Sequence, residues 1–333
     1  MKRKLLILLG IMAFLIMIGS VIIVLVTKNN DTDRELGEDK LKVVATFYPV
    51  YMIGLNLTDG IDEIEVKSLT ELNTGCLHDY ILTTEDMKII SDADVMVING
   101  GGMESFLEDI RTNYPDLTII DASEGIEMLP SDSEHTHEGE LGEEEEEEHD
   151  HGEWNAHVWL DPKLYIEQIE NVTEGLLNYI KTSKGTGLAV ADQLNNNSLM
   201  YIDQIKELDQ QISDLAGQLT LDNENVGEAV IFHDAFAYLA NRVGITVAHT
   251  VPLDSDTSLS AGDIGEIIDE VEAGNIHYLF TELQYSDSIA SQIAAETNAT
   301  VYIIDSAVTG DGAKDSYLKA MQSNVETLKE LIN

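Results

Sequence analysis

The sequence predicts an α/β protein of two lobes, in which parallel sheets flanked by helices are joined by a single long helix. Three observations support this fold class. Short, β-rich apolar runs alternate with helical patterns over residues 41–186, and the same alternation returns over residues 222–333. Between these regions, residues 187–221 keep a helical spacing of apolar residues for about eight turns. Strands that alternate with helices favour parallel sheets covered on both faces.

The N-terminal residues indicate where the protein resides. A basic cluster at residues 2–4 precedes an uncharged stretch over residues 5–26, which is long enough to span a bilayer. Basic residues before a span hold that end in the cytoplasm, so the remainder is expected at the extracellular face of the cytoplasmic membrane. We expect a membrane anchor or signal over residues 1–27 and a polar tether over residues 28–40. The absence of a small-x-small cleavage site favours the anchor.

The N-terminal lobe, residues 41–186, is expected to contain strands and helices in turn. Three short apolar runs bounded by turn residues resemble buried strands, and they cover residues 43–47, 95–99 and 117–121. Residues 83–91 show a helical pattern that opens with the spacing of a capping box. Another helix is expected over residues 163–180, because Asp161 and Pro162 suit its N-cap and first position.

An insertion over residues 131–154 interrupts this lobe and shows no hydrophobic periodicity, which is typical of a disordered segment. Residues 131–157 contain five of the nine histidines, twelve acidic residues and no Lys or Arg. Imidazoles and carboxylates together are ligands for a borderline metal such as zinc. Four histidines are interpreted as an accessory metal-collecting arm: His135, His137, His149 and His151. The alternative is a solvated acidic insertion without a role in metal binding.

The linking segment, residues 187–221, is predicted to be one amphipathic helix. Its apolar residues recur at helical spacing, at Leu194, Tyr201, Ile205, Leu208, Ile212, Leu215 and Leu219. The C-terminal lobe, residues 222–333, then repeats the plan of the first. Its predicted strands cover residues 229–232, 245–247, 278–281 and 301–304. Its predicted helices cover residues 235–243, 262–273, 286–297 and 313–332, and Asp234 is the expected N-cap of the first.

The formal net charge is −44 at pH 7, with 62 acidic and 18 basic residues. An acidic surface argues against nucleic acid as a partner. It concentrates cations around the molecule, although solubility or adaptation to salt explains the charge equally well. Cys76 is the single cysteine, which excludes a disulfide within the chain and leaves either an inert buried residue or a reactive thiol.

Four residues at element ends form the candidate metal site. His233 and Asp305 directly follow predicted strands, while His157 and His78 lie shortly before predicted helices. Open α/β sheets bind ligands outside the carboxyl ends of their strands, so a site in the cleft between the lobes follows. Three imidazoles and one carboxylate complete a tetrahedral shell for Zn²⁺, whereas more carboxylates would suit Mn²⁺. One such histidine is more often structural, so the hypothesis depends on the coincidence of four.

Other residues and functions complete the set of hypotheses. Glu282 ends a predicted strand and is a candidate partner behind a metal-bound histidine. His249 and His277 have no motif around them and are interpreted as structural. A zinc hydrolase is the main competing function, but it requires an open coordination position that Asp305 would fill, and no His-Glu-x-x-His motif occurs. An extracellular zinc buffer or adhesin without a transporter is the other alternative.

Four motifs resemble the solute-binding proteins of ABC-type zinc importers, within the wider group of zinc and manganese receptors. They are Thr74-Gly-Cys-Leu-His78-Asp-Tyr80, His157-Val-Trp-Leu-Asp-Pro162, Phe232-His-Asp-Ala-Phe236-Ala-Tyr238 and Ile303-Ile-Asp305. The resemblance covers roughly residues 41–333. It implies metal bound between two α/β lobes that are joined by a rigid helix, with delivery to a membrane permease powered by a cytoplasmic ATPase. We expect a monomer without enzymatic activity.

The resemblance assigns the metal ligands to His78, His157, His233 and Asp305. The manganese receptors tend to have a carboxylate at the position of His233, so zinc is favoured and a manganese receptor is the alternative. This chain departs from the family in two ways. Many relatives have an acidic residue and Pro where this chain has Cys76-Leu77, so either a thiolate near the metal or a buried structural cysteine is expected. Many Gram-positive relatives also carry a lipid-modified N-terminal cysteine, which is replaced here by the predicted anchor.

Overall fold

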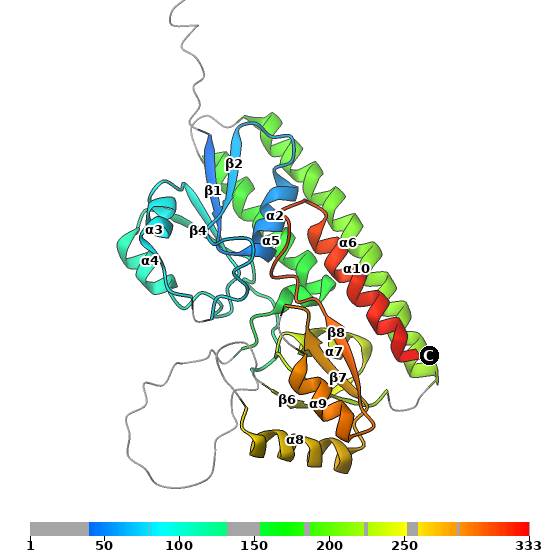
Figure 1. Ribbon diagram of the computed structural model, residues 1–333. Helices are drawn as coiled ribbons and strands as arrows, with labels where there is room; N and C mark the ends of the chain where they lie inside the picture. The colour runs from blue at the N-terminus through cyan, green and yellow to red at the C-terminus, as the bar shows by residue number, and fades with distance from the viewer. Residues whose placement is uncertain are drawn as a thin grey trace, which may run out of the picture. The chain divides into compact units, whose positions relative to one another are not determined.

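The computed structural model describes residues 40–78, 80–131, 154–182, 187–222, 226–251, 259–284 and 287–332. Leu41–Asn333 form one compact unit (Figure 1). No helix in the described ranges is long and apolar enough to cross a bilayer. The predicted anchor, most of the tether and the four histidines of the accessory arm lie outside these ranges.

The N-terminal lobe contains a four-stranded parallel sheet with the strand order β2-β1-β3-β4. The strands are β1 (Leu41–Ala45), β2 (Ile64–Ser68), β3 (Val95–Ile98) and β4 (Thr118–Asp121). The helices between them are α2 (Tyr48–Leu57), α3 (Thr84–Ser91) and α4 (Leu107–Asn113). The predicted capping box is present, because Thr83 and Asp86 exchange side-chain and backbone hydrogen bonds at the start of α3.

One long helix joins the lobes, and a second helix precedes it. A short 3-10 helix, η1 (Val158–Leu160), leads into α5 (Pro162–Thr182), where Asp161 accepts a hydrogen bond from the Lys163 amide as the predicted cap. Helix α6 (Leu188–Asp222) has 35 residues and is therefore about 52 Å long. All seven apolar residues that predicted it are buried. It packs against α2 and α5 of the first lobe and against α7 and α10 of the second, so it spans both lobes (Figure 1).

The C-terminal lobe repeats the topology of the first, with the parallel strand order β6-β5-β7-β8. The strands are β5 (Glu228–Ile231), β6 (Thr246–Thr250), β7 (Tyr278–Glu282) and β8 (Thr300–Ile304). The helices are α7 (Phe236–Val243), α8 (Ala261–Gly274), α9 (Ser288–Glu296) and α10 (Ser316–Lys329), and η2 (Glu330–Ile332) follows.

One hydrophobic core extends from the first lobe along α6 into the inner side of the second lobe. A smaller core lies between the second sheet and α8 and α9. Buried hydrogen bonds also join the lobes: the Trp159 indole N–H donates to the Ser306 carbonyl at 2.8 Å, and the Tyr317 hydroxyl donates to the Trp159 carbonyl at 2.6 Å. The segment that carries η1 is therefore held by the C-terminal lobe.

The predicted fold class is confirmed, and each predicted strand and helix has a counterpart that overlaps it. Strand β2 and helices α2 and α4 were not predicted. Strand β2 is a five-residue edge strand that contains Glu65 and Lys67, so its pattern is too short and too polar to stand out. The expected N-cap of α7 was wrong, because Ala235 occupies that position and no side chain caps the helix. The boundaries of the two lobes at residues 186 and 222 stay a prediction.

Candidate metal centre

Both sheets reverse their strand order at a central pair, β1 and β3 in the first and β5 and β7 in the second. Open α/β sheets bind ligands beyond the carboxyl ends of the strands at such a switch point. In the second sheet, His233 lies two residues after β5, and Glu282 is the last residue of β7. The topology of the C-terminal lobe thus places these two side chains at the switch point.

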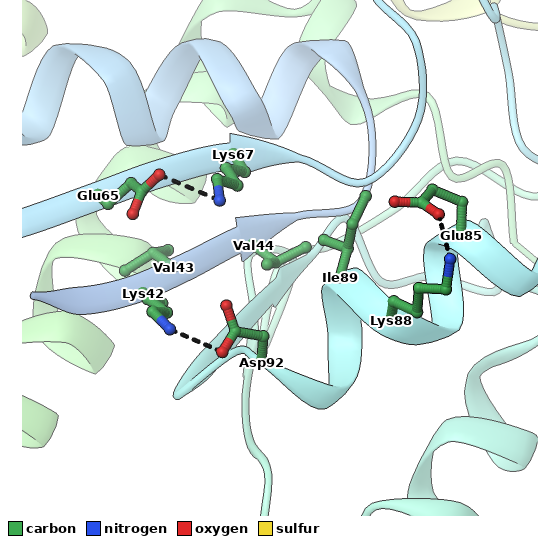
Figure 2. Close-up of a pocket in the computed structure, with 9 residues that line it drawn as sticks. All are labelled: Lys42, Val43, Val44, Glu65, Lys67, Glu85, Lys88, Ile89 and Asp92. Atoms are coloured by element: carbon green, nitrogen blue, oxygen red, sulfur yellow. Dashed lines mark hydrogen bonds and ion pairs between the residues drawn. The ribbon is translucent and has the colours of Figure 1, made fainter. Parts of the chain in front are cut away.

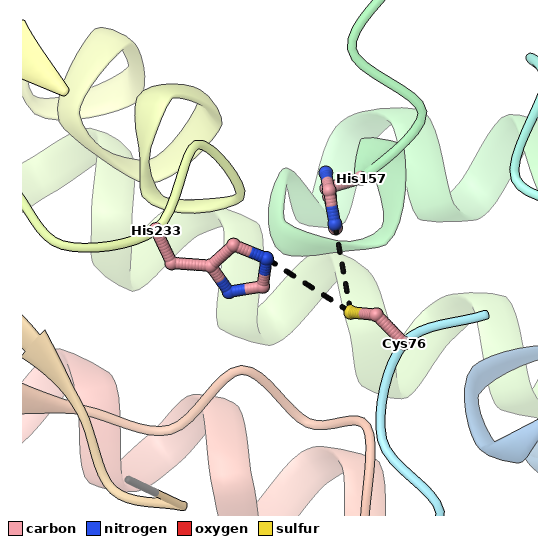
Figure 3. A group of neighbouring side chains, drawn as sticks. All are labelled: Cys76, His157 and His233. Carbon is pink, nitrogen blue, oxygen red and sulfur yellow. Dashed lines mark hydrogen bonds between the residues drawn. The ribbon is translucent and has the colours of Figure 1, made fainter. Parts of the chain in front are cut away.

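Three side chains converge in front of this switch point (Figure 3). The Cys76 Sγ lies 3.5 Å from the His157 Nε2 and 4.0 Å from the His233 Nε2. Donor atoms of the three residues all lie within 4.8 Å of one another. His78 joins them, because its Nε2 lies 3.2 Å from the His157 Nε2. Three histidines predicted as ligands are therefore brought together with the one cysteine, and they come from both lobes.

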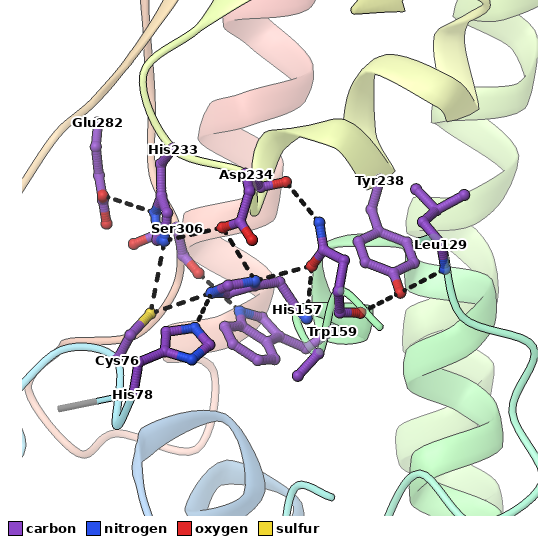
Figure 4. A network of polar contacts seen from close by, with 12 residues as sticks. Cys76, His78, Leu129, His157, Trp159, His233, Asp234, Tyr238, Glu282 and Ser306 are labelled. Carbon is purple, nitrogen blue, oxygen red and sulfur yellow. Dashed lines mark hydrogen bonds and ion pairs between the residues drawn. The ribbon is translucent and has the colours of Figure 1, made fainter. Parts of the chain in front are cut away.

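The orientation of His157 is set by Asn155. The Asn155 Oδ1 lies 2.9 Å from the His157 Nδ1 and also accepts a hydrogen bond from the His157 backbone amide. The Asn155 Nδ2 donates to the Asp234 carbonyl, so the Oδ1 must be the atom that faces the ring. The proton of His157 is consequently on Nδ1, and the lone pair on Nε2 points into the cluster (Figure 4).

His233 is held from behind by a carboxylate. Its Nδ1 lies 2.9 Å from the Glu282 Oε2, and each of the two side chains is 2% exposed. Among the described residues, no hydrogen-bond donor is aligned with either oxygen of Glu282. The contact with His233 is thus a close ion pair rather than a well-aligned hydrogen bond. Asp234 adds a second carboxylate, with its Oδ1 at 3.5 Å from the His233 Nε2 and 3.4 Å from the His157 Nδ1.

The electrostatic environment differs between the two buried imidazoles. Burial lowers the pKa of His157 well below its ordinary value, and the neighbouring His233 and His78 lower it further. Burial also lowers the pKa of His233, but the contacts with Cys76 and Glu282 outweigh burial and hold that pKa well above its ordinary value. For Cys76, burial raises the pKa of the thiol and His233 opposes this shift. A bound cation would take the place of the proton on His233.

Asp305, the fourth predicted ligand, is partly buried at the end of β8. Its Oδ1 accepts hydrogen bonds from the Gln284 Nε2 and the Ala307 amide, both at 2.9 Å. Neither Asp305 nor His78 belongs to the group of donor atoms that Cys76 forms with His157 and His233 in the described part of the chain, and His78 adjoins that group through His157. The assignment of Asp305 as a ligand stays a prediction.

The other predicted side chains have local partners. His249 forms an ion pair with Glu270 at 3.0 Å, and His277 lies 3.0 Å from the Asn275 side chain. Trp159 and Phe236 are 0% and 1% exposed and pack in the core. Asn155 and Asp234 were missed as site residues. Asn155 lies two positions before His157, but this spacing is not specific enough to predict a hydrogen bond to the imidazole.

A hollow of about 200 Å³ lies away from this cluster, between β1, β2 and α3 (Figure 2). Its three lysines pair with acidic residues, as Lys42–Asp92, Lys67–Glu65 and Lys88–Glu85. With its charges already paired and its side chains exposed, the hollow has no group poised for a ligand.

A family model described as ZnuA, "Zinc-uptake complex component A periplasmic", matches residues 43–331. The chain belongs to the ZnuA family. The zinc-binding protein AdcA of Streptococcus pyogenes serotype M3 is 28% identical over 309 residues, which cover 88% of this chain and 56% of AdcA. The iron-binding protein YfeA of Yersinia pestis is 26% identical over 304 residues, covering 90% of this chain and 88% of YfeA. The chain thus spans about half the length of the AdcA proteins that it matches.

Solved structures show the same fold as this member of the ZnuA family. The SBP FpvC from Pseudomonas aeruginosa in complex with Mn²⁺ has a TM-score of 0.72 and 22% sequence identity, and the match covers 88% of this chain and 99% of FpvC. The Zn(II)-bound AdcA from Streptococcus pneumoniae has a TM-score of 0.69 and 23% identity, with coverage of 88% and 58%. These likenesses establish the architecture of two parallel sheets with a long helix.

Proposed function

We propose that this protein is an extracytoplasmic receptor that captures Zn²⁺ and delivers it to an ABC-type permease driven by a cytoplasmic ATPase. The observation that carries the proposal is the convergence of His78, His157 and His233 from both lobes on one point. Membership of a family described as a component of zinc uptake supports it. So does the similarity to AdcA proteins, which are named as zinc-binding.

The donor set favours zinc over manganese. Imidazole nitrogens suit Zn²⁺, whereas Mn²⁺ is better served by carboxylates and water. The two carboxylates nearest to the imidazoles, Glu282 and Asp234, contact ring nitrogens of His233 and His157. They are suited to orient the histidines and to raise their basicity. A manganese receptor of the same family is the weaker alternative, with the fourth ligand at Asp305 as its strongest support.

Capture and release follow from the origin of the ligands. Cys76 and His78 lie in the segment between β2 and α3, while His233 lies at the end of β5. His157 lies directly before η1, which the C-terminal lobe holds. Metal bound to all of them links the two lobes, so a small displacement of the segment that carries Cys76 and His78 would break the shell. Docking to a permease could supply that displacement.

The remaining parts of the proposal concern segments outside the described residues. We place an anchor over residues 1–27, which would keep the receptor at the extracellular face of the cytoplasmic membrane. The four histidines of the accessory arm would capture zinc transiently beside the site. We expect a monomer, since each chain carries the complete set of ligands.

Binding of zinc to single-residue variants tests the receptor site. Isothermal titration of the full chain should show one tight Zn²⁺ site, which His157→Ala and His233→Ala abolish because each removes a buried ligand. His249→Ala is the matched control, since this histidine pairs with Glu270 outside the cluster. Wild-type affinity in His233→Ala would refute the site. Competition with Mn²⁺ should leave zinc bound.

Zinc uptake by cells distinguishes the receptor from its alternatives. Deletion of the gene should reduce zinc uptake at low external zinc, and His233→Ala should fail to restore it. Unchanged uptake after deletion would favour an extracellular zinc buffer or adhesin. Zinc-dependent hydrolysis by the purified protein, lost in His233→Ala, would favour an enzyme instead.

A further inference from the structure

Two separations of donor atoms in the cluster match a tetrahedral zinc shell. With Zn–S of about 2.3 Å and Zn–N of about 2.05 Å, tetrahedral angles place sulfur about 3.6 Å from nitrogen and two nitrogens about 3.3 Å apart. The Cys76 Sγ and the His157 Nε2 are 3.5 Å apart, and the Nε2 atoms of His78 and His157 are 3.2 Å apart. The distance of 4.0 Å from the Cys76 Sγ to the His233 Nε2 requires a shift of a few tenths of an ångström.

The carboxylate of Asp305 has a structural role that needs no metal. Its Oδ1 accepts a hydrogen bond from the amide two residues later, at Ala307, which stabilises the turn after β8. The equivalent residue of the first sheet, Asp121 at the end of β4, accepts the same bond from the Ser123 amide at 2.9 Å. Because this turn recurs at Asp121, which is not a candidate ligand, its presence at Asp305 does not indicate a ligand.

The buried Glu282 carboxylate faces His233 and is suited to a cation at the cluster. Glu282 is 3% exposed, and neither of its oxygens has an aligned hydrogen-bond donor among the described residues. An ionised carboxylate is costly to bury without compensation. Zn²⁺ on the His233 Nε2 would compensate it through the imidazole, whose Nδ1 lies 2.9 Å from the Glu282 Oε2. With Cys76 as a thiolate, one Zn²⁺ balances the sulfur and Glu282, so the buried part of the site is neutral.

We propose that the Cys76 thiolate is a direct metal ligand. It completes a shell of one sulfur and three imidazole nitrogens, and it takes the fourth coordination position, which the family resemblance assigns to Asp305. The S–Zn bond forms as the thiol releases its proton to solvent. This inference rests on the proposed receptor function and makes it more specific. A thiolate ligand selects zinc and other thiophilic ions over Mn²⁺.

Spectroscopy of the full wild-type chain tests this ligand directly. With one equivalent of Co²⁺ in place of Zn²⁺, we expect a sulfur-to-metal charge-transfer band in the near ultraviolet. X-ray absorption at the zinc edge should show one scatterer at about 2.3 Å besides nitrogens at about 2.0 Å. Since the chain has a single cysteine, a thiolate signal can come only from Cys76. Tight zinc binding with nitrogen and oxygen scatterers alone would overturn the proposal and leave the receptor function intact.

Two near-isosteric variants separate the sulfur from the carboxylate. Cys76→Ser should lose the charge-transfer band and lower zinc affinity by more than the ~10- to 100-fold typical of a residue behind a ligand. Its preference for Zn²⁺ over Mn²⁺ should fall as well. Asp305→Asn should keep the band and lose less zinc affinity. The reverse order of the two variants would assign the fourth position to Asp305, and circular dichroism confirms that each variant is folded. Failure of the wild-type chain to bind zinc tightly would instead reject the receptor function.

Discussion

The two sheets have the same strand order, but their switch points are used differently. In the N-terminal lobe the space beyond β1 and β3 is filled by Glu104, which is 4% exposed. Its carboxylate accepts hydrogen bonds from the Thr46 hydroxyl and from the amides of Asn99 and Gly100. In the C-terminal lobe the carboxylate at the switch point is Glu282, which faces His233 and has no aligned donor within the part of the chain that the structure describes.

This difference shows how one topology can produce either a structural or a binding site. Burial raises the pKa of Glu104 to about 7, although its three hydrogen bonds act against that shift. The carboxylate is therefore satisfied by its own lobe and stabilises the ends of β1 and β3. Glu282 is left for the imidazole of His233, whose other nitrogen faces the cluster. A buried carboxylate whose hydrogen-bond donors come from its own lobe stabilises the fold. A buried carboxylate without such donors is available to orient a ligand-binding side chain.

Replacement of Glu104 should produce the largest effect, which is a loss of folding stability. Glu104→Ala leaves three buried donors unpaired, so the free energy of unfolding should fall by about 3 kcal/mol or more. Urea denaturation at neutral pH measures this loss, and zinc affinity of the folded variant should stay close to that of the wild type. Glu104→Gln, which keeps an accepting oxygen, is the control and should lose less. An unchanged midpoint in Glu104→Ala would contradict the structural role of this carboxylate.

The corresponding change in the second lobe should affect binding instead. Glu282→Gln removes the charge behind His233, and we expect zinc affinity to fall by roughly 10- to 100-fold. Stability without metal should change less than in Glu104→Ala, because no backbone donor of the described residues depends on this carboxylate. Competition titration with a zinc chelator and urea denaturation provide the two readouts. A loss of stability without a loss of zinc affinity would show that Glu282, like Glu104, has a structural role.

Acidification should weaken zinc binding through His233. Its pKa is held above the ordinary value, so a proton occupies the ring in the absence of metal and must leave when zinc binds. Below this raised pKa the His233 proton should lower affinity by about tenfold for each pH unit, in addition to the pH dependence that the Cys76 thiol contributes. The same proton stabilises the metal-free fold below the ordinary pKa, and that contribution is lost as pH rises through the raised value. In Glu282→Gln the fall in affinity should begin at a lower pH, and an unshifted profile would exclude Glu282 as its cause.

Removal of the acidic insertion should have the smallest effect. Pro130 and Trp154 form an antiparallel bridge, and the Asn155 amide donates to the Leu129 carbonyl, so the two ends of the insertion meet. Residues 132–153 can therefore be replaced by Gly-Gly. The tight zinc affinity should change by less than about threefold, because no ligand is removed. Complete loss of tight binding would place the site in the insertion and not at the switch point of the second sheet.

The fold was predictable where apolar residues kept a clear period. Helix α6 follows from its seven buried residues, and the strands that end near His233 and Asp305 follow from continuous apolar runs. The short edge strand β2 was not predictable, because its alternation includes charged residues. Helices α2 and α4 were also missed, since their patterns are short and α2 contains a proline in its first turn.

The candidate site was only partly predictable. Histidines at strand ends identify the edge of the sheet where a metal can bind, and the structure brings three of them together. The sequence does not show which carboxylate faces an imidazole, because that depends on the packing of β5 against β7. Asn155 was missed because its contact with His157 is local but its spacing is not specific. Asp234 was missed because its contact with His157 arises from the approach of the two lobes.

Trp159 lies against the metal cluster, and this position makes it an intrinsic fluorophore for the site. Its ring is 5.1 Å from that of His157 by centroids and is fully shielded from solvent, while the other tryptophan, Trp154, is 49% exposed. The sequence contains two tryptophans, so Trp154→Phe leaves emission from the buried indole alone. A divalent charge on the adjacent imidazole would shift that emission. Metal occupancy can then be followed by fluorescence in the unlabelled protein. The reporting indole lies in η1, at the contact between this segment and the C-terminal lobe.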